Sequence, residues 1–266
     1  MQLFRVAFAG YLGEVEILDQ DEEHADFLTS EGVLSRPNSR VLKYHVTSPL
    51  IDSLVRLEVI PARFPNSPLI SPLEFHPKSL HIPQILKESL KFFDRELMQL
   101  ARSRSHKLST VPVQGCSRVP VPRESVYDTE LMRILCNWLK PYGWSVIGQW
   151  RSKTAEGRHR YSDIVLKKLD DTIVLELLAT GDADFIKDHI SKNPEYMSSL
   201  RANEGWVIHF TCEDSFTPIW QSSAQLAGGI NVIHLVHNVE FTQMVMYLYW
   251  RDKTGVERKE SYNLPL

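Results

Sequence analysis

The sequence predicts an α/β fold in which helices flank a mixed β-sheet, preceded by a smaller and mostly helical N-terminal region. From residue 125 onward, an amphipathic helix pattern is followed by three strand-like segments, a second helix and a buried strand, an αβββαβ order. Before residue 105, short apolar runs alternate with proline-rich turns and end in a long helix pattern. We therefore expect an N-terminal region at 1–104, a linker at 105–123 and an α/β domain at 124–266.

Two helices are predicted in the N-terminal region. Ser48 followed by Pro49 is a helix cap with a favoured first helical residue, so a short helix should begin there. Residues 83–102 should form one amphipathic helix. Its apolar stripe consists of Ile85, Leu86, Leu90, Phe93, Leu97 and Leu100. The segment that follows is rich in Pro, Ser and Arg, which is the composition of a linker.

The α/β domain should open with a helix. Ser125 with Asp128 three residues later is a capping-box pattern, and the helix should continue to about Lys140. The segment WSVIGQW then reads as a strand.

Residues 161–167 and 172–179 should pair as a hairpin around a polar turn. A helix is expected from about Asp182, broken near Pro194, because proline lacks the N–H that continues a helix. Three later patterns complete the sheet. They are the strands GWVIHFTCE and INVIHLVHN and the hairpin FTQMVMYLYWRDKTGVERKESYNL.

Composition narrows the class of protein. The chain has 266 residues, 43% of them hydrophobic, a net charge of only −3 and no run of apolar residues as long as a membrane span needs. No signal peptide is recognisable, so we expect an intracellular protein, cytoplasmic or nuclear, without a membrane partner. Cys116, Cys136 and Cys212 lack CxxC or Cys/His spacing, which predicts a reducing compartment and no structural zinc.

Basic residues gather in two stretches. Residues 102–123 contain five Lys or Arg and no acid. Arg151, Lys153, Arg158 and Arg160 lie in the segment that leads into the first hairpin strand. Two interpretations stay open, a solvated linker and loop or a rim that faces the phosphates of a nucleic acid.

Three acids interrupt apolar surfaces. A hairpin symmetric about Leu169 and Asp170 places Asp163 opposite Glu176, at about 5 Å between their β-carbons. Glu130 lies on the apolar row of the preceding helix. Two carboxylates that close repel unless a proton or divalent cation lies between them, and an all-oxygen site suits Mg²⁺. We expect Asp163 and Glu176 to bind Mg²⁺, although an ion pair with an arginine would also explain each acid.

These motifs resemble the PD-(D/E)XK, or restriction-endonuclease-like, superfamily over residues 125 to about 214. The resemblance rests on the helix acid, on Asp163 in YSDIVL, on Glu176 in ELL, and on DFIKDHI and WVIHFT. It implies a restriction-endonuclease-like sheet and a Mg²⁺-dependent endonuclease that cleaves DNA or RNA, with Glu130, Asp163 and Glu176 as catalytic residues. Nucleic acid would then be the partner.

More narrowly, the segments YDTELMRIL, YSDIVLKK, VLELLATG, PEYM and WVIHFT resemble the nuclease-like C-terminal module of Crinkler-type fungal and oomycete proteins. In that family an ATPase commonly precedes the module, and TSPLIDSLVRLEVIP resembles the tail of that ATPase. The resemblance implies an effector whose N-terminal region contacts a protein partner. No GxxxxGK[ST] motif is present, so we expect no ATP site of that kind.

Leu178 is where this chain departs from the superfamily pattern. It stands at the lysine of the ExK motif, which would orient water and stabilise developing charge, and leucine can do neither. Some relatives carry the lysine on the following helix, which makes Lys187 the candidate replacement. His189 and His209 read as satisfied core residues. Two functions therefore stay open, a Mg²⁺-dependent endonuclease and an inactive pseudo-nuclease that binds nucleic acid or protein.

Overall fold

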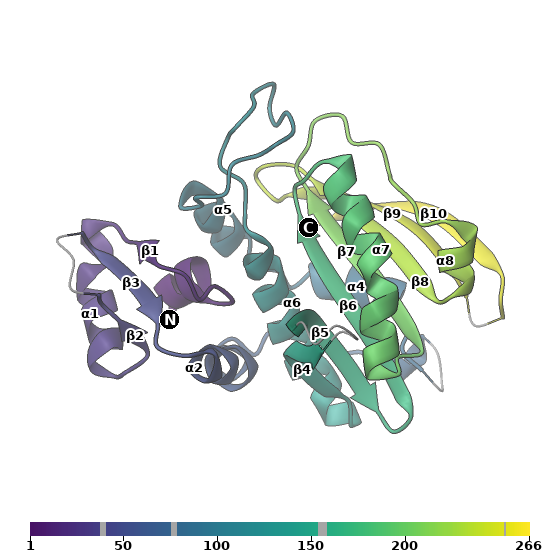
Figure 1. The fold of residues 1–266 in the computed structure, drawn as a ribbon, viewed down its shortest axis with the longest axis horizontal. Helices are drawn as coiled ribbons and strands as arrows, with labels where there is room; N and C mark the ends of the chain where they lie inside the picture. The colour runs from purple at the N-terminus through teal and green to yellow at the C-terminus, as the bar shows by residue number, and fades with distance from the viewer. Residues whose placement is uncertain (38–40, 76–78, 154–158, 253) are drawn as a thin grey trace.

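A seven-stranded mixed sheet is the centre of the larger part of the protein (Figure 1). The computed structural model describes residues 1–37, 41–75, 79–153, 159–252 and 254–266, with the backbone alone at 149–153 and 159–161. The strand order is β10-β9-β8-β7-β6-β5-β4. The strands are β4 (Ser145–Lys153), β5 (His159–Lys168), β6 (Asp171–Ala179), β7 (Glu204–Thr211), β8 (Ile230–His237), β9 (Gln243–Arg251) and β10 (Glu257–Pro265). Strands β6, β7 and β8 run parallel and the other neighbours antiparallel, which confirms the predicted mixed sheet.

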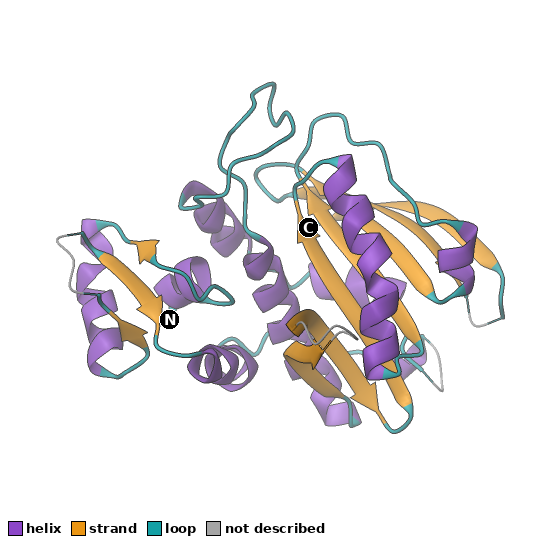
Figure 2. Cartoon of the chain, viewed as in Figure 1, coloured by secondary structure: helices purple, strands orange, loops and turns teal. Residues whose placement is uncertain are grey.

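Helices cover both faces of this sheet (Figure 2). One face carries α6 (Glu124–Leu139) together with α4 (Ile82–Leu90) and α5 (Arg95–Ser103), and the other carries α7 (Ala183–Leu200). The short helices η5 (Lys140–Tyr142) and α8 (Ser223–Ala227) precede β4 and β8.

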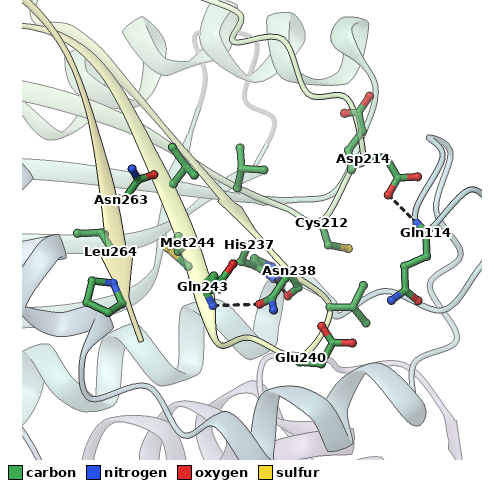
Figure 3. Close-up of a pocket in the computed structure, with 15 residues that line it drawn as sticks. Gln114, Cys212, Asp214, His237, Asn238, Glu240, Gln243, Met244, Asn263 and Leu264 are labelled. Atoms are coloured by element: carbon green, nitrogen blue, oxygen red, sulfur yellow. Dashed lines mark hydrogen bonds between the residues drawn. The ribbon is translucent and has the colours of Figure 1, made fainter.

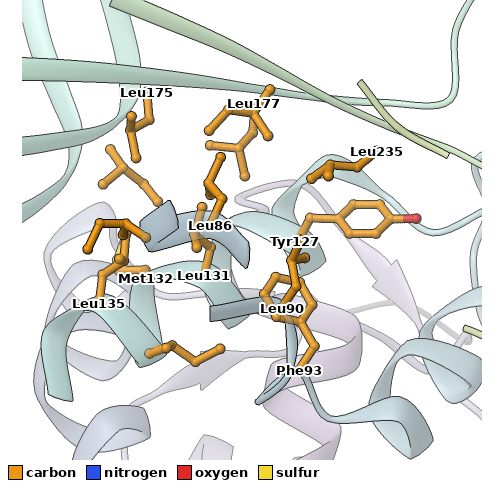
Figure 4. Packing of buried hydrophobic residues seen from close by; sticks show 14 of the residues in the cluster. Leu86, Leu90, Phe93, Tyr127, Leu131, Met132, Leu135, Leu175, Leu177 and Leu235 are labelled. Atoms are coloured by element: carbon orange, nitrogen blue, oxygen red, sulfur yellow. The ribbon is translucent and has the colours of Figure 1, made fainter. Parts of the chain in front are cut away.

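The alternation of side chains along β6 fills both layers. Leu175 and Leu177 pack into the cluster that contains α4 and α6 (Figure 4), whereas Val174 and Leu178 pack against α7. Each of these four side chains is at most 1% exposed, and full burial of one such side chain stabilises the fold by about 1.5–3 kcal/mol. The near-continuous apolar run of β6 therefore reflects a strand covered on both sides.

The N-terminal region is mostly helical, as predicted, and also contains a small sheet of order β1-β3-β2. The strands are β1 (Val15–Glu16), β2 (Leu34–Ser35) and β3 (Lys43–Val46). The helices are η1 (Phe4–Phe8), η2 (Asp19–Asp21), α1 (Glu22–Ser30), α2 (Pro49–Leu54), η3 (Val55–Val59), α3 (Ile60–Arg63) and η4 (Pro72–Glu74). The helix start predicted at Ser48 is confirmed, because its hydroxyl accepts a hydrogen bond from the backbone N–H of Ile51 at 3.2 Å.

Three local expectations were wrong. The helix predicted over 83–102 is two helices, because the Asp94 carboxylate caps a new start by accepting from the backbone N–H of Leu97 at 3.0 Å. Helix α7 continues through Pro194, since packing of its buried face outweighs one lost backbone hydrogen bond. Helix α6 begins at Glu124 and its cap residue, Arg123, makes no side-chain capping bond, so no capping box forms at Ser125.

The predicted linker lies against the sheet. Its start and end come together, since the backbone N–H of Val121 donates to Lys107 O at 3.0 Å, and Val113 shares a small apolar cluster with Cys212 after β7. In the described part of the chain, no helix is both long and apolar enough to cross a bilayer.

Candidate active site

Strands β5 and β6 separate within the sheet and form a fork. Their ladder ends at the pair Ile164 and Leu175, beyond which β5 continues along β4 and β6 continues along β7. The register of the hairpin places Asp163 opposite Glu176, as its predicted symmetry requires. These two acids are thus the first residues inside the fork, where backbone groups of the two strands no longer pair with each other.

The two acids have different surroundings. The Asp163 carboxylate accepts a hydrogen bond from the backbone N–H of Leu177 at 2.7 Å, and Asp163 is half-buried. Glu176 is only 4% exposed, and its Oε1 lies 3.3 Å from Nδ1 of His189 on α7. Among the described residues Glu176 Oε2 has no hydrogen-bond partner. An orphaned carboxylate oxygen in a buried place is costly, so this atom points to a missing positive partner.

The pKa values of Asp163 and Glu176 also show that burying their charged forms is unfavourable. Burial and then the charge of Glu176 raise the pKa of Asp163 well above its ordinary value. Burial also raises the pKa of Glu176, although the hydrogen bond and charge of His189 oppose the rise. Both directions mean that two ionised carboxylates are unfavourable here without a cation.

Two further acids reach the fork from the first turns of α6. Burial and the charge of Glu176 raise the pKa of Glu124 to about 7, and burial raises that of Asp128 to about 6 against the opposing charge of Arg56. The charges of both contribute to the raised pKa of Asp163. The sequence prediction missed these residues. Their i, i+4 spacing, which places both on one helix face, was the available signal.

Glu130 was expected to converge with the hairpin acids, but the structure places it elsewhere. Residues two apart on a helix point about 200° apart, so Glu130 faces away from Asp128. Its carboxylate is fully buried and lies 2.5 Å from Nη2 of Arg5 and 3.0 Å from Nη2 of Arg133. Glu130 therefore belongs to a structural ion-pair network with the N-terminal region and not to the fork.

Lys187 was expected to replace the missing lysine, but the structure places it away from the fork. Its side chain is 63% exposed on the outer side of α7 and lies 3.7 Å from the carboxylate of Asp184. Leu178 is fully buried in an apolar cluster with Ile186 and Ile190 of α7. Neither position brings a positive charge to the fork.

The predicted basic rim falls where little is described. Arg158 lies outside the described residues, and for Arg151, Lys153 and Arg160 only the backbone is described. These three occupy the ends of β4 and β5 beyond the fork, in a ladder that pairs Lys153 with His159. Their role towards nucleic acid stays a prediction.

The chemistry of the fork fits a hard divalent cation. Its donors are carboxylate oxygens, one of them without a partner, and Mg²⁺ binds through one or two carboxylates while it keeps several waters. No three His, Cys, Asp or Glu side chains of the described residues are grouped closely enough to enclose a metal by themselves. Asp163 and Glu176 would therefore hold a cation whose other ligands are water or substrate.

A large cavity lies away from the fork. It measures about 650 Å³ and opens between the ends of β8, β9 and β10, with Cys212 and His237 in its wall (Figure 3). Its wall contains three acids, Glu213, Asp214 and Glu240. Asp214 is already engaged, because its carboxylate accepts hydrogen bonds from the backbone N–H groups of Gln114 and Gly115, each at 2.7 Å. Among the described residues, none of these three acids has a buried carboxylate oxygen without a partner, so we place the candidate site at the fork.

Comparison with known proteins adds little to this geometry. No protein-family model and no curated protein matches the chain. One solved structure, SfsA of Pyrococcus furiosus in complex with Ca²⁺, is 11% identical and aligns over 59% of this chain and 75% of its own, with a TM-score of 0.28. A TM-score this low does not establish a common fold, so the site rests on its own residues.

Proposed function

We propose that this protein is a metal-dependent nuclease that hydrolyses phosphodiester bonds of DNA or RNA. The observation that carries the proposal is the pair Asp163 and Glu176, two facing carboxylates inside the fork with raised pKa values and an orphaned oxygen. Such a pair is retained at a cost to stability, and a role in holding a cation explains that cost. The sequence resemblance to PD-(D/E)XK nucleases supports the same interpretation.

Asp163, Glu176 and His189 have distinct roles in this proposal. Asp163 and Glu176 would hold Mg²⁺, which when bound supplies Lewis acidity towards a phosphate oxygen and lowers the pKa of water. The Nδ1 of His189 contacts Oε1 of Glu176, and the other oxygen has no hydrogen-bond partner among the described residues. In hydrolysis, water adds to phosphorus and the bond to the leaving sugar oxygen breaks. One proton leaves the water, and the leaving oxygen takes one up from solvent.

One observation favours a second function. The position of the motif lysine is filled by Leu178, which is fully buried and apolar, so no cation acts from that point. A pseudo-nuclease that binds nucleic acid or protein without cleaving it is therefore the alternative. A Crinkler-type effector role, with a protein partner at the N-terminal region, is part of the proposal in either case.

Metal binding and cleavage test the proposal together. We expect the parent protein to bind Mg²⁺ in a calorimetric titration and to nick a plasmid or cleave an RNA only when Mg²⁺ is present. Glu176→Gln should weaken Mg²⁺ binding by at least about tenfold and abolish cleavage, because an amide supplies no charge to the cation.

Asp170→Asn is the matched control, since Asp170 is exposed at the turn of the same hairpin. This control should bind Mg²⁺ and cleave like the parent. Magnesium binding without cleavage of either nucleic acid would leave the pseudo-nuclease, and absence of both would contradict the metal site as well.

A further inference from the structure

Lys107 brings a positive charge to the fork from the segment between α5 and α6. Its Nζ donates a hydrogen bond to the backbone carbonyl of Ala179 at 3.0 Å. Ala179 ends β6, three residues beyond Glu176 or about 10 Å along the strand. The charge of Lys107 also acts on Glu124, where it opposes the rise in pKa. The ammonium therefore lies at the end of the fork towards which β6 runs.

The positive charge of Lys107 is not balanced by a nearby carboxylate in the described part of the chain. Lys107 is half-buried, and burial lowers its pKa. Among the described residues, no carboxylate lies within ion-pair distance of Nζ. Its one hydrogen bond goes to a neutral carbonyl, and it lies 5.9 Å from the ring centroid of Phe185. Half-buried lysines usually gain a charged partner, so the unpaired donors of Lys107 indicate a place for an anion.

In the part of the chain whose side chains are described, the arginine and lysine that also act on these acids already have partners. Arg56 pairs with Asp128 and Asp52, and its Nε donates to Thr129. Lys192 pairs with Asp188 on the exposed side of α7.

We infer that Lys107 binds a phosphate group of the nucleic-acid strand held at Asp163 and Glu176, and so supplies the positive charge that Leu178 does not. The inference rests on the proposed function for the identity of the strand. A cation at this point would stabilise the charge that develops on the phosphate oxygens during hydrolysis. The lysine would thus come from the segment before α6 instead of from β6.

The test compares Lys107→Met with Lys168→Met. Both lysines are half-buried and donate to one backbone carbonyl, Lys168 to that of Tyr142 at 2.8 Å, but Lys168 lies at the turn end of β5, far from the fork. Methionine keeps much of the apolar stem, so losses of stability should be similar in the two variants. Only Lys107→Met should lower Mg²⁺-dependent cleavage, by about 10²-fold.

A second readout separates this inference from the proposed function. With a labelled single-stranded oligonucleotide and no metal, Lys107→Met should weaken binding and reduce the slope of log K against log salt by about 0.7, the share of one phosphate contact. Lys107→Arg should restore both readouts in part.

Three results decide between the two claims. If the parent cleaves and the two methionine variants behave alike, the inference is wrong and the nuclease stands. If the parent binds without cleaving and only Lys107→Met weakens binding, the phosphate contact stands and catalysis does not. If the parent neither cleaves nor binds, both are overturned.

Discussion

Some residues at the fork lower the stability of the fold. Glu176 interrupts an apolar strand that is covered on both faces, and its Oε2 lacks a partner among the described residues. That Asp163 faces Glu176 could be predicted from sequence, because acids within apolar strands stand out and a hairpin fixes which residues face each other. The contact of His189 with Glu176 could not be predicted, since nothing in the sequence places a histidine of the next helix beside Glu176.

Leu178 occupies a buried position at which a charged side chain would be costly. A lysine there would carry the charge of the PD-(D/E)XK motif that the sequence resembles, but the side chain of Leu178 packs with Ile186, Ile190 and Val207. Leu178→Lys should therefore lower the free energy of unfolding by about 3–5 kcal/mol, as expected for a buried charge without a partner. Urea unfolding measures the effect. Leu169→Lys, at a leucine that is 94% exposed, should change stability little, and equal effects of both substitutions would contradict this account.

At the scale of elements, the candidate site combines the strands β5 and β6 with residues of the helices α6 and α7. The sequence predicted the hairpin and its register, because alternation and the turn decide both. It predicted the wrong face of α6. The apolar row of that helix drew attention to Glu130, whereas Glu124 and Asp128 face the fork, and Glu130 is buried because two arginines from distant positions meet it. Partners distant in sequence cannot be read from the periodicity of a single helix.

The acids of the fork should make stability depend on pH. The ordinary pKa of Glu124 is 4.5 and its pKa in the fold is about 7, so the folded state binds a proton more tightly than the unfolded chain. The resulting stabilisation is complete below pH 4.5 and is lost as the pH rises through 7. Between pH 5 and 8, Glu124→Gln should lose less stability than the parent, by on the order of 1–3 kcal/mol.

Chemical unfolding at pH 5 and pH 8 measures this difference, with Glu23→Gln on the exposed surface of α1 as the control. The buried His234 and His237, whose pKa values burial lowers to about 4, act in the opposite sense in every variant and cancel in the comparison. Added Mg²⁺ should stabilise the parent more at pH 8 than at pH 5. An identical pH dependence in the parent and Glu124→Gln would contradict a raised pKa of Glu124 beside Glu176.

For the whole molecule, the N-terminal region and the sheet are joined more closely than the predicted linker indicates. Helix α4 of that region shares the main hydrophobic cluster with α6 and the central strands (Figure 4), and α5 contributes Leu97, Met98 and Ala101 to the same cluster. The proline-rich segment 105–123 has the composition of a linker, yet Lys107 and Val113 of that segment make contacts at the ends of β6 and β7. Composition reports local conformation and contains no information on what a loop packs against.

Arg56 of the N-terminal region contacts α6 beside the candidate site, and its substitution measures how strongly that region holds the helix. Its guanidinium, 1% exposed, forms a short ion pair with the carboxylate of Asp128 on α6, and Asp52 lies 3.6 Å away on its other side. Arg56→Met should lower the free energy of unfolding by about 3–5 kcal/mol, because it leaves the acid buried without its partner. Asp128→Asn removes that acid, so the double variant should be less destabilised than the sum of the single variants by about 0.5–3 kcal/mol, the range for groups in contact. Urea unfolding of the four proteins gives the coupling energy, and additive effects within about 0.5 kcal/mol would mean that the N-terminal region does not hold α6 through this pair.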